Sequence, residues 1–361
     1  MEQQTDRIKS RASNMELLRV VAMFMVLMVH ADFLALGAPD ANLVHQEPLF
    51  AFGQYFFEAL SIGCVDLFVL LSGWFGIKPK WSGFCNFIFQ CLFFSAGILG
   101  VMLLLGKVEM GSLKDWAKGV AGIFSMIGGE WFTKSYIGLY LLAPLLNLYV
   151  EKVSRTTLRN FLIAFYLFQT LYGWVSNGAG FFIGGYSTMS FIGLYLLARY
   201  VRLYPMKCTS WSGKADLLVY VGLSLVLTLT VFAWEYVGVA SFTARMYSYV
   251  SPLVIVAVLY LLLAFSKWRI GHHAWINWLG ASSFAVYLLH TNMYLLEPYF
   301  LSTVRHLFSR FEGISSLLVV FAFLLAVFAV SVLLDQPRKY LWKTYVSKIV
   351  ERWTRLSLIH I

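Results

Sequence analysis

Residues 14–33 read NMELLRVVAMFMVLMVHADF, an apolar run long enough to cross the hydrocarbon core of a bilayer as a helix. Every residue between Arg19 and His30 is Val, Ala, Met, Phe or Leu. At about 100° per residue, the eleven steps between them return almost to the starting direction, so we predict that the two side chains share one helix face about 16 Å apart along the axis. Because titratable groups inside membrane segments usually face a protein interior or a water-filled cavity, this pair is the first candidate functional feature.

The composition extends this reading to the whole chain. Hydrophobic residues make up 60% of the 361 residues, charged residues 13%, and the mean hydropathy is +0.72. We predict an all-α fold, a polytopic membrane helix bundle of about ten transmembrane helices. The predicted spans are 15–35, 50–76, 84–106, 132–150, 158–175, 180–198, 216–234, 247–265, 275–296 and 315–334.

Basic residues indicate the orientation of the bundle. With both termini in the cytoplasm, most of the 28 Lys and Arg residues fall on the cytoplasmic side, as the positive-inside rule requires. We therefore predict an N-in, C-in protein of the inner (cytoplasmic) membrane, with a basic N-terminal tail (1–14), a membrane domain (15–335) and a basic C-terminal tail (336–361). The net charge of +10 then reflects cytoplasmic loops, so a nucleic-acid partner is not expected.

Counting depth at about 1.5 Å per residue places Arg19 near the cytoplasmic surface and four polar groups in one deeper layer. These four are His30, Glu58, Asp66 and His290. A neutral imidazole can take a proton from a hydroxyl, and a carboxylate such as Asp66 or Glu58 could orient it. In the alternative reading, Asp66 pairs with backbone or with Arg19 to hold helices together, and His290 belongs to an aromatic core helix.

Arg19, Lys78 and Lys80 are the candidate anion site, because they are expected together near the inner surface where phosphates could reach them. The lysines also fit an ordinary cytoplasmic loop, and Glu16, three residues before Arg19, could form a purely structural ion pair with it. The four cysteines have no metal-ligand spacing, and no metal site is expected.

Five motifs, in order along the chain, resemble the acyltransferase 3 family of membrane acyltransferases. They are the Arg19 and His30 spacing, the block CVDLFVLLSGWFG at 64–76 with Asp66, Phe68, Ser72 and Gly73, Trp131-Phe132 followed by YLLAP at 140–144, YLLH at 287–290, and Asp335-Gln336-Pro337-Arg338. The resemblance covers residues 14 to about 340. The chain departs from the family pattern at Cys64, where Gly is usual, and at Lys78-Pro79-Lys80, where arginines are frequent.

The resemblance implies an O-acetyltransferase that moves an acyl group, most often acetyl, to a hydroxyl of a surface glycan or a lipid-linked sugar. Acetyl-CoA would be a co-substrate, with no bound cofactor, and the partners would be the acyl-CoA, the sugar acceptor and the lipid bilayer. It implies His30 as base or transient acyl carrier and Asp66 as orienting group. Arg19, Lys78 and Lys80 would lie on the donor side, and Glu58, Ser72, Trp131 and His290 would support the site.

Two other classes of function remain open from the residues alone. A proton-coupled transporter or flippase of glycan or lipid intermediates could use His30, Asp66, Glu58 and His290 as a relay, although no internal repeat is visible. A structural partner of a glycan-assembly complex would need no chemistry at these positions. The Gly- and aromatic-rich segment 171–190 is a candidate acceptor surface, or simply a turn between two spans.

Overall fold

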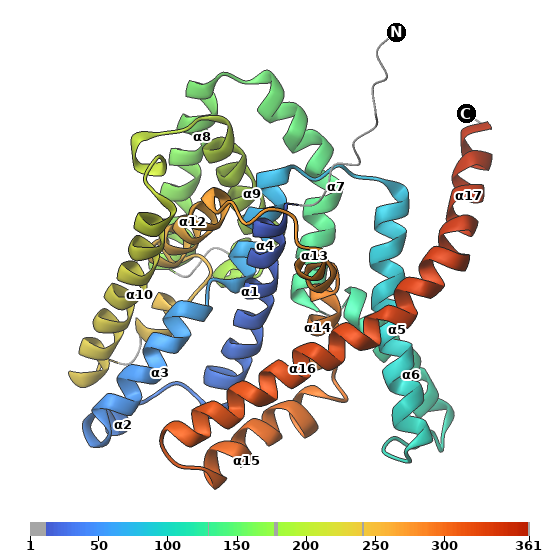
Figure 1. The fold of residues 1–361 in the computed structure, drawn as a ribbon, viewed down its shortest axis with the longest axis horizontal. Coiled ribbons are helices and arrows are strands. Elements are labelled where there is room, and N and C mark those ends of the chain that lie inside the picture. The colour runs from blue at the N-terminus through green and yellow to red at the C-terminus, as the bar shows by residue number, and fades with distance from the viewer. Residues whose placement is uncertain (1–11, 129, 177–179, 240–241, 360–361) are drawn as a thin grey trace.

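The computed structural model describes residues 12–128, 130–176, 180–239 and 242–359 (Figure 1). Within these ranges the chain is all-helical, with 82% of residues in helices and no strand. The predicted all-α class is therefore confirmed.

Each predicted span overlaps helical structure, although α9 begins only at Thr188 in the predicted span 180–198 and α12 only at Pro252 in the predicted span 247–265. The corresponding elements are α1 (Ser13–Val29) with η1 (His30–Leu34), α3 (Pro48–Ser61) with α4 (Cys64–Phe75), α5 (Trp81–Leu104), α7 (Trp131–Lys152), α8 (Arg155–Phe168) with η2 (Gln169–Val175), α9 (Thr188–Leu203), α10 (Gly213–Tyr236), α12 (Pro252–Lys267), α13 (Ala274–Gly280) with α14 (Ser283–His290), and α16 (Ile314–Leu341). Between and after them lie α2 (Ala41–Gln46), α6 (Leu113–Gly128), η3 (Ile183–Gly185), η4 (Lys207–Thr209), α11 (Thr243–Met246), η6 (Leu296–Leu301), α15 (Ser302–Arg310), η7 (Trp342–Val346) and α17 (Ser347–Ile359).

Five helical segments in the described ranges are long and apolar enough to cross a membrane. They are Ser13–Leu34, Pro48–Phe75, Trp81–Leu104, Gly213–Tyr236 and Ile314–Thr354, and α12 is a shorter apolar helix. Large apolar side chains such as Leu49, Leu104 and Ile314 are exposed on the outside of the bundle, as lipid contact requires. These features identify a multi-pass membrane protein.

Three local features differ from the predicted pattern. The second span is broken after Ser61, where Gly63 lies so close to Val258 that a Cβ there would come within 2.1 Å of its side chain. The stretch 107–131, which lies between the third and fourth predicted spans, contains the helix α6. The last span continues without interruption through Asp335 to Leu341.

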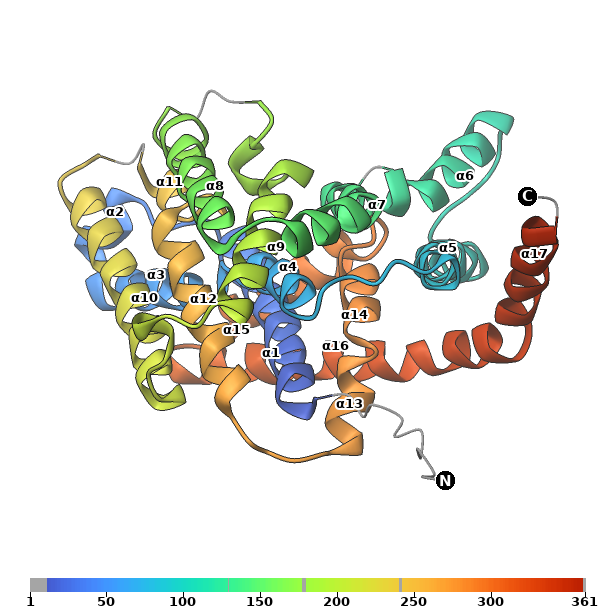
Figure 2. The same ribbon diagram turned by 90° about the horizontal axis from the view of Figure 1, so that it is seen from above.

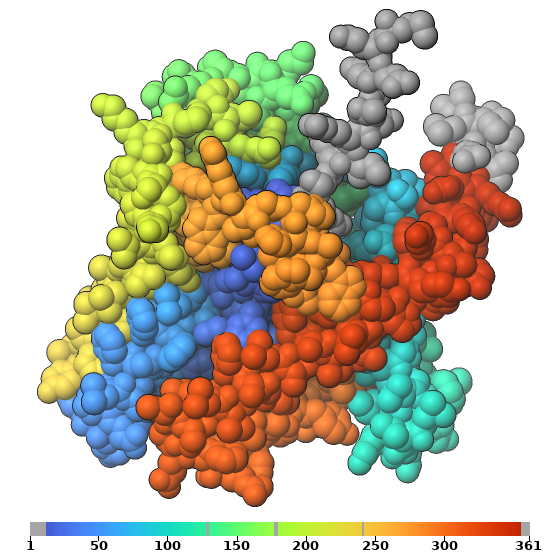
Figure 3. All heavy atoms as spheres, in the orientation of Figure 1, coloured from blue at the N-terminus to red at the C-terminus, as the bar shows by residue number. Residues whose placement is uncertain are grey.

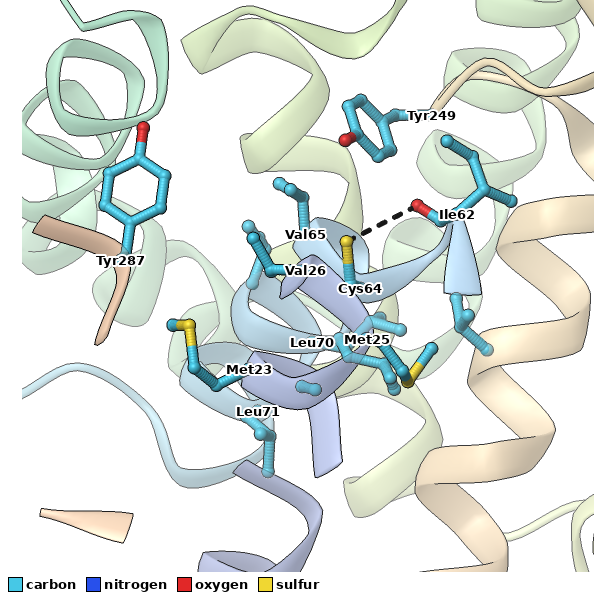
Figure 4. Packing of buried hydrophobic residues seen from close by; sticks show 14 of the residues in the cluster. Met23, Met25, Val26, Ile62, Cys64, Val65, Leu70, Leu71, Tyr249 and Tyr287 are labelled. Atoms are coloured by element: carbon cyan, nitrogen blue, oxygen red, sulfur yellow. Dashed lines mark hydrogen bonds between the residues drawn. The ribbon is translucent and has the colours of Figure 1, made fainter. Parts of the chain in front are cut away.

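Helix α1 lies in the centre of the bundle, where it contacts α3, α4, α12, α13, α14 and α16 (Figures 1 and 2). In the space-filling view its blue atoms are visible in a recess between those of α3 and α16 (Figure 3). On its covered side, Val26 packs beside Cys64 and Val65 of α4, as Figure 4 shows. The central position of α1 places both Arg19 and His30 inside the protein.

Candidate active site

A cavity of about 730 Å³ runs along α1. From α1 and η1 it is lined by Arg19, Met23, Val26, Val29, His30 and Leu34. The spacing of four, three and four residues from Arg19 through Met23 and Val26 to His30 follows a single helix face. The two polar residues that the sequence singled out therefore line one cavity, with apolar side chains between them.

One end of the cavity, called here the basic end, contains Arg19 together with Lys78 and Lys80 from the link between α4 and α5. The Tyr140 hydroxyl of α7 donates to the backbone carbonyl of Lys80 at 2.8 Å and also accepts from its backbone N–H. Arg19 forms an ion pair with Glu16 at 2.5 Å, the local pair considered from the sequence, and its side chain is still 30% exposed. Three cations thus line an open end of the cavity.

The other end, called here the histidine end, contains His30 at the first position of the π-helical turn η1. Its Nδ1 atom lies 2.9 Å from Nε2 of His290, the last residue of α14. The Nδ1 atom of His290 lies in turn 2.6 Å from the carbonyl oxygen of Val286. Short π-helical insertions are frequent at functional sites, and this one begins at the residue of interest.

These two contacts determine the protonation pattern of a neutral histidine pair. The Val286 carbonyl can only accept, so Nδ1 of His290 must carry a proton and donate it. The remaining nitrogen of His290, Nε2, then has a free lone pair and accepts the proton on Nδ1 of His30. The Nε2 atom of His30 is left unprotonated, which is the form that a general base requires.

The two carboxylates predicted near His30 do not line the cavity. Asp66 is completely buried in the first turn of α4, and neither of its carboxylate oxygens has a hydrogen-bond partner within the described ranges. Glu58 is also buried, and it lies on α3, which precedes the break in the second span. In place of a carboxylate, the group that contacts Nδ1 of His30 is the imidazole of His290.

Ser72 and Trp131, the other predicted supporting residues, both line the cavity. The Ser72 hydroxyl lies 2.8 Å from the Phe68 carbonyl and 3.2 Å from the Tyr136 hydroxyl. The Trp131 ring lies 5.8 Å from that of Tyr249, measured between centroids. Both residues therefore shape the cavity wall.

Several polar lining residues were not anticipated from the sequence. They are Ser82, Asn86, Gln90, Glu130, Tyr136, Tyr249, Ser283 and Thr291, whereas Tyr140 and Tyr287, which also line the cavity, begin two of the five motifs. Asn86 is connected to the last motif, because the buried guanidinium of Arg338 donates to its Oδ1 atom at 2.9 Å and pairs with Asp335 at 2.8 Å. The Asp335-Gln336-Pro337-Arg338 motif was the sequence feature that could have pointed to the contact between Arg338 and Asn86. The other residues are polar or aromatic positions on apolar helices and carry no comparable signal.

The segment 171–190 contributes no residue to this cavity, although residues 177–179 lie outside the described ranges. Its Tyr186 packs against the cavity-lining Trp131 and Tyr249, with ring centroids 4.3 Å and 5.2 Å away. The described residues contain no group of three or more His, Cys, Asp or Glu side chains able to hold a metal ion.

Comparison with known proteins agrees with the resemblance that the motifs indicate. The sequence profile of the acyltransferase 3 family, described as "Acyltransferase domain", matches residues 13–336. No curated protein sequence and no solved structure gives a significant match. Because the profile spans nearly the whole chain, the protein belongs to the acyltransferase 3 family of membrane acyltransferases.

Proposed function

We propose that the protein is an O-acetyltransferase, which moves the acetyl group of acetyl-CoA to a sugar hydroxyl of a surface glycan or its lipid-linked precursor. Family membership supports acyl transfer. The observation that carries the rest is a single cavity with three cations at one end and an imidazole with an unprotonated Nε2 at the other. The cations suit a phosphate-bearing donor, and the imidazole suits activation of a hydroxyl.

In this proposal His30 acts as general base. Its Nε2 atom takes the proton of the acceptor hydroxyl while the hydroxyl oxygen attacks the thioester carbonyl. The carbon–sulfur bond then breaks, an ester forms on the sugar, and the thiolate of CoA receives the proton from the His30 imidazolium. During the step, the Nε2 atom of His290 continues to accept from Nδ1 of His30 and stabilises the positive ring.

The donor would bind with its phosphates at the basic end. Arg19 offers a planar fork of donors to phosphate oxygens, and Lys78 and Lys80 add two flexible positive charges. The apolar wall formed by Met23 and Val26 would hold the pantetheine arm as it extends toward His30. Asp66 and Glu58 take no direct part and are assigned a structural role.

The predicted topology completes the proposal. Ten spans with both termini in the cytoplasm put the basic end toward the cytoplasmic acetyl-CoA pool and the histidine end toward the far side of the inner membrane. An acceptor beyond the membrane could then be modified without transport of the donor. A transporter or a structural partner of an assembly complex would not consume acetyl-CoA.

The test compares wild-type protein with His30→Ala in cells and in purified form. We expect wild type to consume radiolabelled acetyl-CoA and to increase the mass of a surface glycan by acetyl units, whereas His30→Ala inserts normally and does neither. The matched control is His272→Ala, since His272 is exposed and away from the cavity. Normal glycan acetylation by His30→Ala would contradict the proposed mechanism, and a mass increment of a larger acyl group would change the assigned donor.

A further inference from the structure

A second, more open cavity of about 580 Å³, called here the outer groove, lies beyond the histidine end. It is bounded by the chain that follows η1, by α2 and α3, and by α15 (Figure 1). Its polar and aromatic lining consists of Asp40, Phe50, Gln54, Arg305, Phe308 and Ser309. The mechanism described above uses none of these residues.

The linings of the main cavity and the outer groove follow one another along the chain. Leu34, the last residue of η1, lines the main cavity and is 49% exposed. The next residues, Ala35 and Leu36, line the outer groove. A molecule in the groove would therefore contact the chain about one helical turn after His30.

The lining differs in chemistry from the basic end. The charges of Asp40 and Arg305 are opposite, so the groove has no net preference for an anion such as phosphate. Asp40 accepts from the backbone N–H of Leu43 through Oδ1, and Arg305 forms an exposed ion pair with Glu297 through Nη2. The other oxygen of Asp40 and the other nitrogens of Arg305 can therefore bond to a ligand.

The aromatic residues add a second requirement. Phe50 and Phe308 supply flat apolar surface next to these polar groups. A neutral ligand with hydroxyls along its edge and a C–H face on its ring satisfies both kinds of lining, and a sugar ring has this character. The volume is within the range of pockets that hold small ligands.

We propose that the outer groove is the acceptor subsite, which holds a neutral saccharide unit with one hydroxyl directed toward His30. This inference rests on the proposed function, because it assigns the acceptor side of the same reaction. It names a hexose-type saccharide as the ligand class and places recognition on α2, α3 and α15, away from the donor.

The experiment uses the full chain in lipid nanodiscs. Binding of methyl glycosides of glucose, galactose, mannose, rhamnose and N-acetylglucosamine is measured by saturation-transfer NMR, and acetyl transfer to them is measured with radiolabelled acetyl-CoA. The variants are Phe308→Ala and Arg305→Gln. Their controls, Phe311→Ala and Arg310→Gln, are exposed residues at the end of α15 that do not line the groove.

We expect at least one glycoside to bind, and each groove variant to weaken its binding and raise its KM about tenfold, the effect of losing roughly 1.4 kcal/mol. The KM for acetyl-CoA and both control variants should match wild type. The inference is overturned if no glycoside binds wild type, or if the groove variants bind as wild type does. Binding that depends on Phe308 and Arg305 without any acetyl transfer would support the groove as a saccharide site and overturn the proposed function instead.

Discussion

At the scale of single residues, the proposed chemistry depends on which nitrogen of His30 carries a proton. The Val286 carbonyl sets the protonation of His290, and His290 sets that of His30. This ordering resembles the way a carboxylate orients a catalytic imidazole, except that the orienting group is itself a neutral ring. A neutral partner avoids placing an additional buried charge beside the reacting groups.

The first residue-scale prediction concerns His290. Replacement by Leu removes the acceptor for Nδ1 of His30, so the ring can adopt the wrong tautomer, and we expect kcat to fall about 100-fold. His290→Gln retains a side-chain acceptor and should recover part of the rate. The KM values for both substrates should change little, because the proposed role is positioning. Steady-state kinetics of the two variants provide the measurement, and equal loss in both would count against the tautomer argument.

The second concerns Arg19 at the basic end. Arg19→Gln removes charge-assisted bonds to the donor phosphates, and we expect the KM for acetyl-CoA to rise by about 10- to 100-fold. The rise relative to wild type should shrink at high salt, because screening weakens the attraction between Arg19 and the donor phosphates in the wild type. The KM of Arg19→Lys for acetyl-CoA should lie between those of wild type and Arg19→Gln. An unchanged KM for acetyl-CoA in Arg19→Gln would show that Arg19 serves only its ion pair with Glu16.

The candidate site was partly accessible from the sequence. Intramembrane Arg19 and His30 stand out because charged and titratable groups are rare in apolar segments. The depth count also placed His30 and His290 in one layer, and the two rings are in contact. Depth alone does not give the direction of a side chain, however, so Asp66 and Glu58 were expected in the same cluster although neither lines the cavity.

At the scale of helices, the block CVDLFVLLSGWFG has a structural as well as a chemical basis. Gly73 lies where α4 meets α9, and a Cβ at this position would come within 2.5 Å of the backbone oxygen of Tyr195. The close approach of these helices holds α4, with Ser72, against the wall of the cavity. Close helix packing at small residues is common in membrane proteins.

We therefore expect Gly73→Ala to destabilise the protein by about 1–3 kcal/mol, because α4 and α9 must move apart. The matched control is Gly97→Ala on α5, where an added Cβ meets nothing within 4 Å. That control should leave Tm unchanged or raise it slightly, since Ala favours helix more than Gly. Thermal unfolding of both variants in one detergent provides the comparison. Equal Tm values would contradict the packing argument.

The helices themselves were largely predictable, since each apolar run became helical. The break after Ser61 was not, because it depends on contact with Val258 of α12, far away in sequence. The same holds for the π-helical turn at His30, which hydropathy cannot reveal. The helix α6 was missed because its Gly-rich composition resembles a loop.

At the scale of the whole molecule, α1 is surrounded by helices from both halves of the chain. The cavity along it has chemically different ends, which the sequence suggested through the separation of Arg19 from His30. No single helix encloses this space, and residues from α1, α4, α5, α7 and α14 contribute to its wall. Such an arrangement allows a donor and an acceptor to meet from opposite sides.

The measurement that tests this account most directly is acetyl transfer across a sealed membrane. Proteoliposomes with one protein orientation receive radiolabelled acetyl-CoA only on the side of Lys78 and Lys80, and a glycoside acceptor only on the opposite side. The account predicts acetylated glycoside on the acceptor side, lost in His30→Ala, with no acetyl-CoA crossing the bilayer. Product that forms only when donor and acceptor share one compartment would contradict it.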